Sequence, residues 1–341
     1  MQKLNWKRTA GSLAIVFLLT LLILLVFHQQ REEIFSSLSA VSAGGLFLIM
    51  VLGTLSNVLD ALAHRTLIQT SHVRLSVKRA VELIYLGLFS NVATLATGTV
   101  PLQSYYLHQC GMIAGAGMGT LLVEYSFHKT MVLLYAGVML LAGRQWFRIL
   151  HVGNGAYLLA GYGIAIAIIA FFTLLCCNRR IQSYLGKLID RIPEKGSWIK
   201  RKVVWQSHLI ALGRQSRHIF VQRHACIRSW VFTGCKLFVL YSIPFVCLRL
   251  LGNSTLTFWQ AHLLSALMLL FTGAIPNIGG VGPTEAAFLL LFSPHLSQAA
   301  VLSALILYRI ATYYIPFLLG TVVFFRWYRS VQPGMVPKEK Q

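Results

Sequence analysis

The chain has 341 residues, of which 56% are apolar and only 11% are charged, and its formal net charge is +21. Soluble domains carry about a quarter charged residues, so this composition excludes an ordinary soluble protein and indicates a polytopic membrane protein. The basic residues gather between apolar runs, as they do in the cytoplasmic loops of membrane proteins. No DNA-binding or RNA-binding signature accompanies them, so we expect no nucleic-acid partner.

Eight apolar segments approach or exceed the length of about 20 residues that a helix needs to cross a bilayer. The first follows Lys7 and Arg8, is too long for a signal-peptide core and lacks a cleavage site, so we expect an uncleaved helix whose start is cytoplasmic. The sequence therefore predicts an all-α integral membrane protein. The eight segments are residues 9–27, 45–63, 81–97, 119–142, 154–177, 230–250, 258–275 and 299–325.

The charges of the loops constrain the topology. Residues 64–79, residues 178–229 and the tail from 326 are basic, and the positive-inside rule places all three in the cytoplasm. This arrangement requires that 81–118 and 258–298 each enter and leave the membrane on one face. One such re-entrant hairpin would open from the cytoplasm and the other from outside, as in an inverted-repeat transporter whose broken helices meet near the midplane.

We therefore expect a single transmembrane domain over residues 1–341. Its first half would be 1–177, turning at Gly98–Pro101, and its second half 230–325, turning at Pro276–Pro283, followed by a short basic tail (326–341). Between the halves, residues 178–229 place apolar and basic residues at helical spacing. This pattern predicts a basic amphipathic helix, which either lies on the inner leaflet and attracts anionic lipid or is a solvated connector.

The break at residues 275–285 is the most informative stretch of the chain. It places two prolines, three glycines and Glu285 inside an apolar run. Broken backbone in hydrocarbon leaves polar groups without partners, and a charge at the bilayer centre costs roughly 3 kcal/mol. Two costly features together predict a site, in which N–H groups near Gly279, Gly280 and Gly282 attract an anionic headgroup. Glu285 would orient the loop or exchange a proton. The alternative is a loop at the membrane surface.

Other polar residues also lie in or beside apolar segments. Such residues usually face the interior of a helix bundle. Glu124 shares a helix face with His128, four residues on. Each carboxylate is either functional or part of a structural ion pair. No cysteine and histidine spacing fits a metal template and no catalytic arrangement stands out, so we expect no metal and no cofactor. The carboxylates are Asp60, Glu82, Glu124 and Glu285, and their candidate partners are His128, Lys129, Lys236, Arg249 and Arg309.

Three stretches carry a resemblance to a known family. Residues 276–285 resemble the Pro-x-Pro-Gly-Gly-x-Gly-x-x-Glu signature of the lysylphosphatidylglycerol synthase transmembrane region family, with Ile278 where the family often has proline. Residues 98–105 are similar to its Gly-Gly-Gln-Pro-x-Gln-x-Tyr motif, with Thr99 and Val100 as departures. The first-half site therefore either holds a different headgroup or is degenerate. Residues 307–320, which include Arg309, resemble the last helix of the family.

The resemblance implies a flippase-like module that moves a lipid, or a lipid-linked intermediate, between the leaflets of the bacterial inner membrane. The loop charges place both termini in the cytoplasm. The chain ends soon after its last apolar segment, so we expect no soluble aminoacyl-transferase domain, which favours a transporter over an enzyme. The expected partners are anionic membrane lipids. The candidate transport site comprises Glu285, Arg309, Gly279, Gly280, Gly282, Pro276, Gly98, Pro101, Gln103, Tyr105 and Glu124.

Two other functions stay open. The first is a membrane-embedded enzyme or enzyme subunit that acts on lipid-linked substrates, with Glu285 as a base and Arg309 as a phosphate clamp. The second is a scaffold that transports nothing and positions a lipid-modifying enzyme as its partner. The lipid, the direction of transport, its energy source and the oligomeric state do not follow from the residues.

Overall fold

The computed structural model describes residues 31–94, 97–143, 145, 155–191, 197–273 and 282–331, and these residues form helices and no strand. The all-helical fold class is thereby confirmed. The helices are α2 (Arg31–Ser39), α3 (Ala43–Ile68), α4 (Val77–Ala93), α5 (Thr99–Gln109), α6 (Ala114–Ala142), α8 (Gly155–Cys177), α9 (Arg179–Asp190), α10 (Ser197–Val221), α11 (Arg223–Leu250), α12 (Phe258–Thr272), α13 (Pro283–Phe292), the 3₁₀-helix η2 (Ser293–His295), α14 (Gln298–Arg309), the π-helix η3 (Ile310–Tyr314) and α15 (Ile315–Val331).

Five helical segments in the described part of the chain are long and apolar enough to cross a membrane. They confirm the multi-pass expectation, although the predicted first segment, residues 9–27, lies outside the described residues. Helix α8 exposes large apolar side chains, among them Leu159 and Phe171, which lipid would cover in a membrane. The five segments are Ala43–Ile68, Ala114–Ala142, Leu159–Cys177, Arg223–Leu250 and Gln298–Val331.

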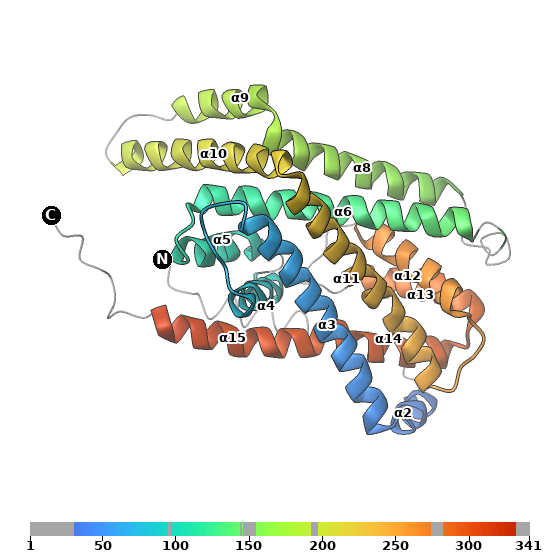
Figure 1. Cartoon of the computed structure of the whole chain (residues 1–341). Helices are drawn as coiled ribbons and strands as arrows, with labels where there is room; N and C mark the ends of the chain where they lie inside the picture. Colours follow the sequence, from blue (N-terminus) through green and yellow to red (C-terminus); the bar gives the residue numbers. More distant parts are fainter. Residues whose placement is uncertain are drawn as a thin grey trace.

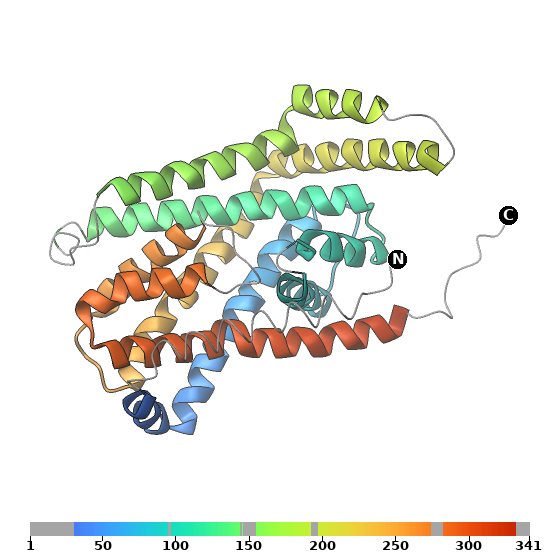
Figure 2. The same cartoon turned by 180° about the vertical axis from the view of Figure 1, so that it is seen from behind.

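Two pairs of short helices are held between longer ones. Helices α3 and α11 pack along each other and cross the molecule diagonally (Figure 1). The pair α4 and α5 lies on one side of this crossing and the pair α12 and α13 on the other, and the view from behind agrees (Figure 2). Helix α6 contacts α5 and α12, whereas α15 contacts α4 and α14 contacts α13. Both short pairs therefore lie between α6 and the α14–η3–α15 segment.

Polar residues fix several helix starts inside an otherwise apolar sequence. The hydroxyl group of Ser42 accepts a hydrogen bond from the Gly45 N–H at 3.2 Å at the start of α3, and Ser76 does the same for α4. Helix α12 begins with a capping box, in which Thr257 accepts from the Gln260 N–H and the Gln260 side chain accepts from the Thr257 N–H. These contacts satisfy N–H groups that a helix N-terminus leaves without partners.

The first break agrees with the prediction only in part. Helix α4 ends at Ala93 and Gly98 directly precedes α5, so Thr99, Val100 and Pro101 of the predicted turn are helical. Pro101 is the third residue of α5, where its missing N–H costs nothing because the first turn of a helix has no carbonyl to donate to. In the second break, residues 276–281 lie outside the described residues. Pro283 is the first residue of α13, a position that its fixed φ angle favours.

The predicted segment 299–325 is not one continuous α-helix. Helix α14 ends at Arg309, the π-helix η3 follows directly, and α15 continues the chain. A π-helical turn is rare, and such turns are frequently found at functional sites. Here it lies against α3, where Gly53 allows a close approach: a Cβ atom on Gly53 would lie 2.2 Å from the carbonyl oxygen of Ala311. A π-helical turn contains one residue more than an α-helical turn, and the periodicity of the sequence does not indicate it.

The basic region 178–229 contains two helices, α9 and α10, before α11 begins at Arg223. The amphipathic helix predicted there corresponds to α10, which packs along α6. Gly115 of α6 makes this contact close, because a Cβ atom there would lie 2.1 Å from the carbonyl oxygen of His208. Val203 and Ile210 of α10 remain exposed. One face of α10 is therefore part of the helix bundle, and the proposed contact of the other face with lipid stays a prediction.

Candidate functional site

Glu285 and Arg309 form a buried ion pair. Glu285 lies in the first turn of α13 and Arg309 is the last residue of α14, so the chain brings together two charges from different helices. The guanidinium Nη2 contacts the carboxylate Oε1, and each side chain is only 9% exposed. A buried charge is costly unless it is paired, and this pairing allows both charges to exist among apolar helices.

The start of α13 adds a second polar feature to this ion pair. Gly282 has φ = 103°, a conformation that favours glycine, and its N–H donates to the Glu285 Oε2 at 2.6 Å. The Glu285 carboxylate thus satisfies one free N–H of the helix N-terminus with one oxygen and binds Arg309 with the other. The Arg309 guanidinium also lies over the Tyr313 ring, 5.2 Å from its centroid. This half-helix start with an adjacent arginine is suited to an anionic group such as a phosphate.

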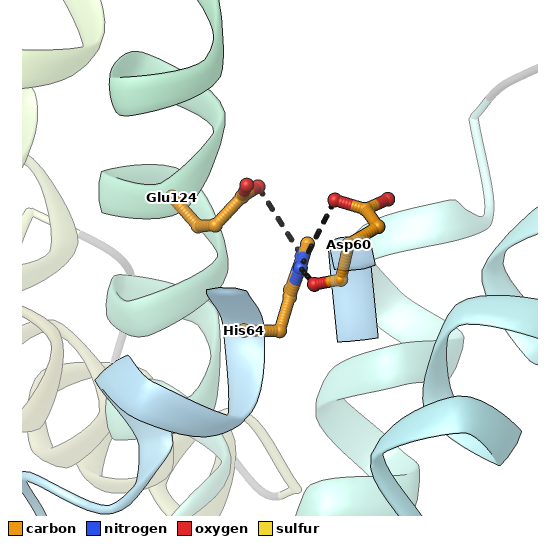
Figure 3. A group of neighbouring side chains, drawn as sticks. All are labelled: Asp60, His64 and Glu124. Carbon is orange, nitrogen blue, oxygen red and sulfur yellow. Dashed lines mark hydrogen bonds and ion pairs between the residues drawn. The ribbon is translucent and has the colours of Figure 1, made fainter. Parts of the chain in front are cut away.

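A second polar cluster lies between α3, α6 and α11. Its centre is His64 of α3, whose Nε2 lies 3.2 Å from the Oε2 of Glu124 on α6. The His64 Nδ1 lies 2.9 Å from the main-chain oxygen of Asp60, one turn earlier on α3. Figure 3 shows the imidazole ring between the two acidic residues. On α11, the Lys236 Nζ pairs with the Asp60 Oδ1 at 2.8 Å. Two acids, one lysine and one histidine therefore meet inside the helix bundle.

This second cluster borders a cavity of about 240 Å³. The cavity is also lined by uncharged polar side chains of the α4–α5 pair, namely Asn91, Thr99 and Gln103. Glu124 Oε1 and Thr99 Oγ1 are buried, and they have no hydrogen-bond partner within the described part of the chain. Polar atoms of this kind are usually satisfied by water or by a ligand. Thr99, from the first-half break, therefore lines the same cavity as Glu124 and His64.

The cluster does not have the arrangement of a metal site. Asp60, His64 and Glu124 offer ligand atoms within 4.8 Å of one another. However, the ammonium group of Lys236 already neutralises Asp60, and the two carboxylates approach different nitrogen atoms of the imidazole ring. A single ion can be bound by only one of these nitrogens. We therefore assign these residues to an ion-pair network.

The structure brings some of the predicted site residues together and separates others. Gly282 lies beside the Glu285–Arg309 pair and donates to Glu285. Gln103 and Glu124 line the cavity. Gln103 is 7% exposed, and its amide donates to the Leu83 carbonyl at 3.0 Å. Pro101 is exposed. Two further predicted residues do not line this cavity. Gly98 is the N-cap residue of α5, and the Tyr105 ring packs against the Trp327 ring. Pro276, Gly279 and Gly280 lie outside the described residues.

Sequence reasoning missed the central residue of the second cluster. His128, four residues on, was one of several candidate partners of Glu124, but the partner in the structure is His64, which is 60 positions earlier and was not among the candidates. A signal was present in the sequence, because Asp60 and His64 are also four residues apart at the end of an apolar segment and share a helix face if the helix continues past that segment. Lys236 was one of several candidate cations, and only the fold selects it as the partner of Asp60.

The comparison with known families agrees with this architecture. The profile described as "Lysylphosphatidylglycerol synthase TM region" matches residues 10–320, which is most of the chain. No curated protein matches the sequence. The match includes both breaks, the buried ion pair and the polar cluster. The chain therefore belongs to the lysylphosphatidylglycerol synthase TM region family, and it is a multi-pass membrane protein associated with lipid metabolism or transport.

Proposed function

We propose that this protein moves an anionic lipid, or a lipid-linked intermediate, between the leaflets of a bacterial inner membrane. The observation that carries the proposal is the buried Glu285–Arg309 ion pair at the start of α13. An ion pair inside a membrane protein is costly to build, and ionisable groups in such places commonly belong to a substrate path. A lipid phosphate can take the place of the Glu285 carboxylate on Arg309, since both are anions whose oxygen atoms accept hydrogen bonds from a guanidinium group.

The cavity next to α5 supports the same proposal. A headgroup that crosses the bilayer needs polar surroundings along its path, because hydrocarbon offers it no hydrogen bonds. Asn91, Thr99 and Gln103 supply such groups on the α4–α5 side, and the Glu285–Arg309 pair supplies them on the α12–α13 side. Helix α3 connects the two places, because Gly53 contacts η3 and Asp60 lies two turns further on. We propose that the headgroup passes along α3.

Reconstitution tests this function. Purified protein is placed in vesicles of phosphatidylethanolamine and phosphatidylglycerol that contain a fluorescent phosphatidylglycerol, and a membrane-impermeant quencher reports the fraction in the outer leaflet. We expect loss of the protected inner-leaflet signal in vesicles with protein and its retention in empty vesicles. A new lipid species in the mass spectrum would favour the enzyme instead. Neither exchange nor a new species, with a second protein retained on purification, would favour the scaffold.

The proposed topology makes a separate prediction. The positive-inside rule places both termini in the cytoplasm and the connection between α6 and α8 outside. In a variant without native cysteines, a single cysteine introduced at Gln145 should therefore react with an impermeant thiol reagent in intact cells. A cysteine at exposed Arg180 in the basic region should react only after the cells are opened. Cytoplasmic reactivity at position 145 would exclude the two re-entrant hairpins.

A further inference from the structure

The imidazole of His64 faces a hydrogen-bond acceptor at each of its two nitrogens. Its Nδ1 lies 2.9 Å from the main-chain oxygen of Asp60, and this Asp60 carbonyl oxygen can only accept a hydrogen bond. Nδ1 must therefore carry a proton. Its Nε2 lies 3.2 Å from the Oε2 of Glu124. An ionised carboxylate also only accepts, so a second proton has to lie between these two atoms, on His64 or on Glu124.

The His64–Glu124 contact consequently depends on one proton. Without it, the lone pair of Nε2 and a carboxylate oxygen would face each other at 3.2 Å inside the protein, where the repulsion is screened far less than in water. With it, the two atoms form a charge-assisted hydrogen bond between α3 and α6. Protonation therefore favours the observed contact between these helices, and deprotonation favours their separation.

The charges around the pair come from three helices. Helix α3 contributes Asp60, and α11 contributes Lys236, which pairs with it. Helix α6 contributes His128 at the cavity and Lys129, whose ammonium group lies over the Tyr125 ring. Helices α4 and α5 present only neutral polar groups to the cavity. Since Lys236 balances Asp60, the Glu124 charge is balanced only when the extra proton is bound to the pair.

The cavity gives the proton a route to the pair. It is lined by both Glu124 and His64, and its volume of about 240 Å³ is sufficient for several water molecules. The Glu124 Oε1 and the His128 Nδ1 are buried and have no hydrogen-bond partner in the part of the chain that the structure describes. Both can bind water in the cavity. The Glu124 carboxylate thus contacts His64 with one oxygen and is open to water with the other.

We propose that the His64–Glu124 pair is a proton-binding site and that proton binding there is coupled to lipid exchange. This inference rests on the proposed transport function and names its energy source. The proton comes from a hydronium ion in the cavity, which leaves a water molecule, and it is returned to water after the conformational change. One O–H bond of the hydronium ion breaks and one N–H or O–H bond forms on the pair, and release of the proton reverses this exchange. The coupling arises because the cavity that the pair borders, which α3 and α5 both line, also lies on the proposed path of the headgroup.

Two measurements on the full-length protein test this proposal. In the first, vesicles of phosphatidylethanolamine and phosphatidylglycerol contain a fluorescent phosphatidylglycerol and an entrapped pH indicator, under an imposed gradient of one pH unit, which is about 1.4 kcal/mol. In the second, infrared difference spectra between acidic and alkaline buffer record the carboxyl and imidazole bands of the protein in detergent. The variant is Glu124→Gln, whose amide N–H can donate to a neutral His64 and keep the contact without a titrating proton.

The matched control is Glu82→Gln, because Glu82 is a carboxylate on α4 that accepts from the Tyr106 hydroxyl group at 2.7 Å and does not line the cavity. We expect wild type and Glu82→Gln to move protons together with lipid and to exchange lipid severalfold faster with the gradient in one direction. Glu124→Gln should exchange lipid at a rate independent of the gradient, move no protons, and lack one titrating group in the infrared spectra.

The possible failures are distinguishable. Lipid exchange by wild type that ignores the pH gradient would overturn the coupling and leave the proposed function intact. Absence of any lipid exchange would overturn the proposed function and the coupling with it. The infrared spectra test the proton-binding site without any transport measurement. The same titrating bands in wild type and Glu124→Gln would exclude the His64–Glu124 pair as a proton-binding site.

Discussion

Replacing Arg309 with alanine should abolish lipid exchange and lower the stability of the protein. The change removes the cation that pairs with Glu285 and leaves a carboxylate that is 9% exposed without its partner. Breaking a buried ion pair by removing one partner costs about 3–5 kcal/mol. Glu285→Gln should also abolish exchange, because it leaves the Arg309 charge buried, although the glutamine oxygen can still accept from the Gly282 N–H. Exchange in vesicles and thermal unfolding in detergent measure the two effects.

A double variant separates function from folding. Glu285→Gln combined with Arg309→Gln removes both charges, so no unpaired charge remains, and we expect it to recover a large part of the lost stability. It should still exchange no lipid, since neither residue can bind or release a phosphate by exchange of ion pairs. The control is Arg249→Ala, because Arg249 is an exposed residue at the end of α11. Normal exchange by the double variant would remove the ion pair from the mechanism.

The Glu285–Arg309 pair shows what the sequence alone could predict. A carboxylate beside prolines and glycines in an apolar run is costly, so its place in the chain already indicated a site. The fold then places Arg309 next to it because α13 and α14 are consecutive helices joined only by η2 and a short turn. A contact between two consecutive helices does not depend on how distant parts of the chain pack, and both residues were therefore predicted as site residues.

The His64–Glu124 contact shows what the sequence could not predict. Its residues lie on α3 and α6, and α4 and α5 separate them along the chain. Local spacing favoured His128 as the partner of Glu124, because residues four apart share a helix face. Which faces of two distant helices meet depends on packing against the rest of the bundle. Here α3 fits closely against η3 at Gly53, and α6 fits closely against α10 at Gly115. The same reason explains why the π-helix η3 was not predicted.

Gly53→Ala should destabilise the protein although alanine is the better helix former. A Cβ atom at position 53 would lie 2.2 Å from the carbonyl oxygen and 2.9 Å from the carbonyl carbon of Ala311. Both are main-chain atoms of η3, which cannot rotate away as a side chain could. Overpacking of this kind costs about 1–3 kcal/mol. The control is Gly163→Ala in α8, where nothing lies within 4 Å of the added atom, so its effect should be neutral or favourable by up to about 1 kcal/mol.

The two glycine variants should also differ in function. Helix α3 carries Gly53 against η3. Asp60 of the polar cluster lies seven residues or about 10 Å further along the helix axis, and His64 lies one turn beyond Asp60. An α3 helix displaced from η3 should therefore weaken the contact of His64 with Glu124 as well as the surroundings of Arg309. We expect Gly53→Ala to slow lipid exchange and to alter the titrating infrared bands of the His64–Glu124 pair, whereas Gly163→Ala should change neither. Slowed exchange with unaltered bands would show that α3 does not link the ion pair to the proton site.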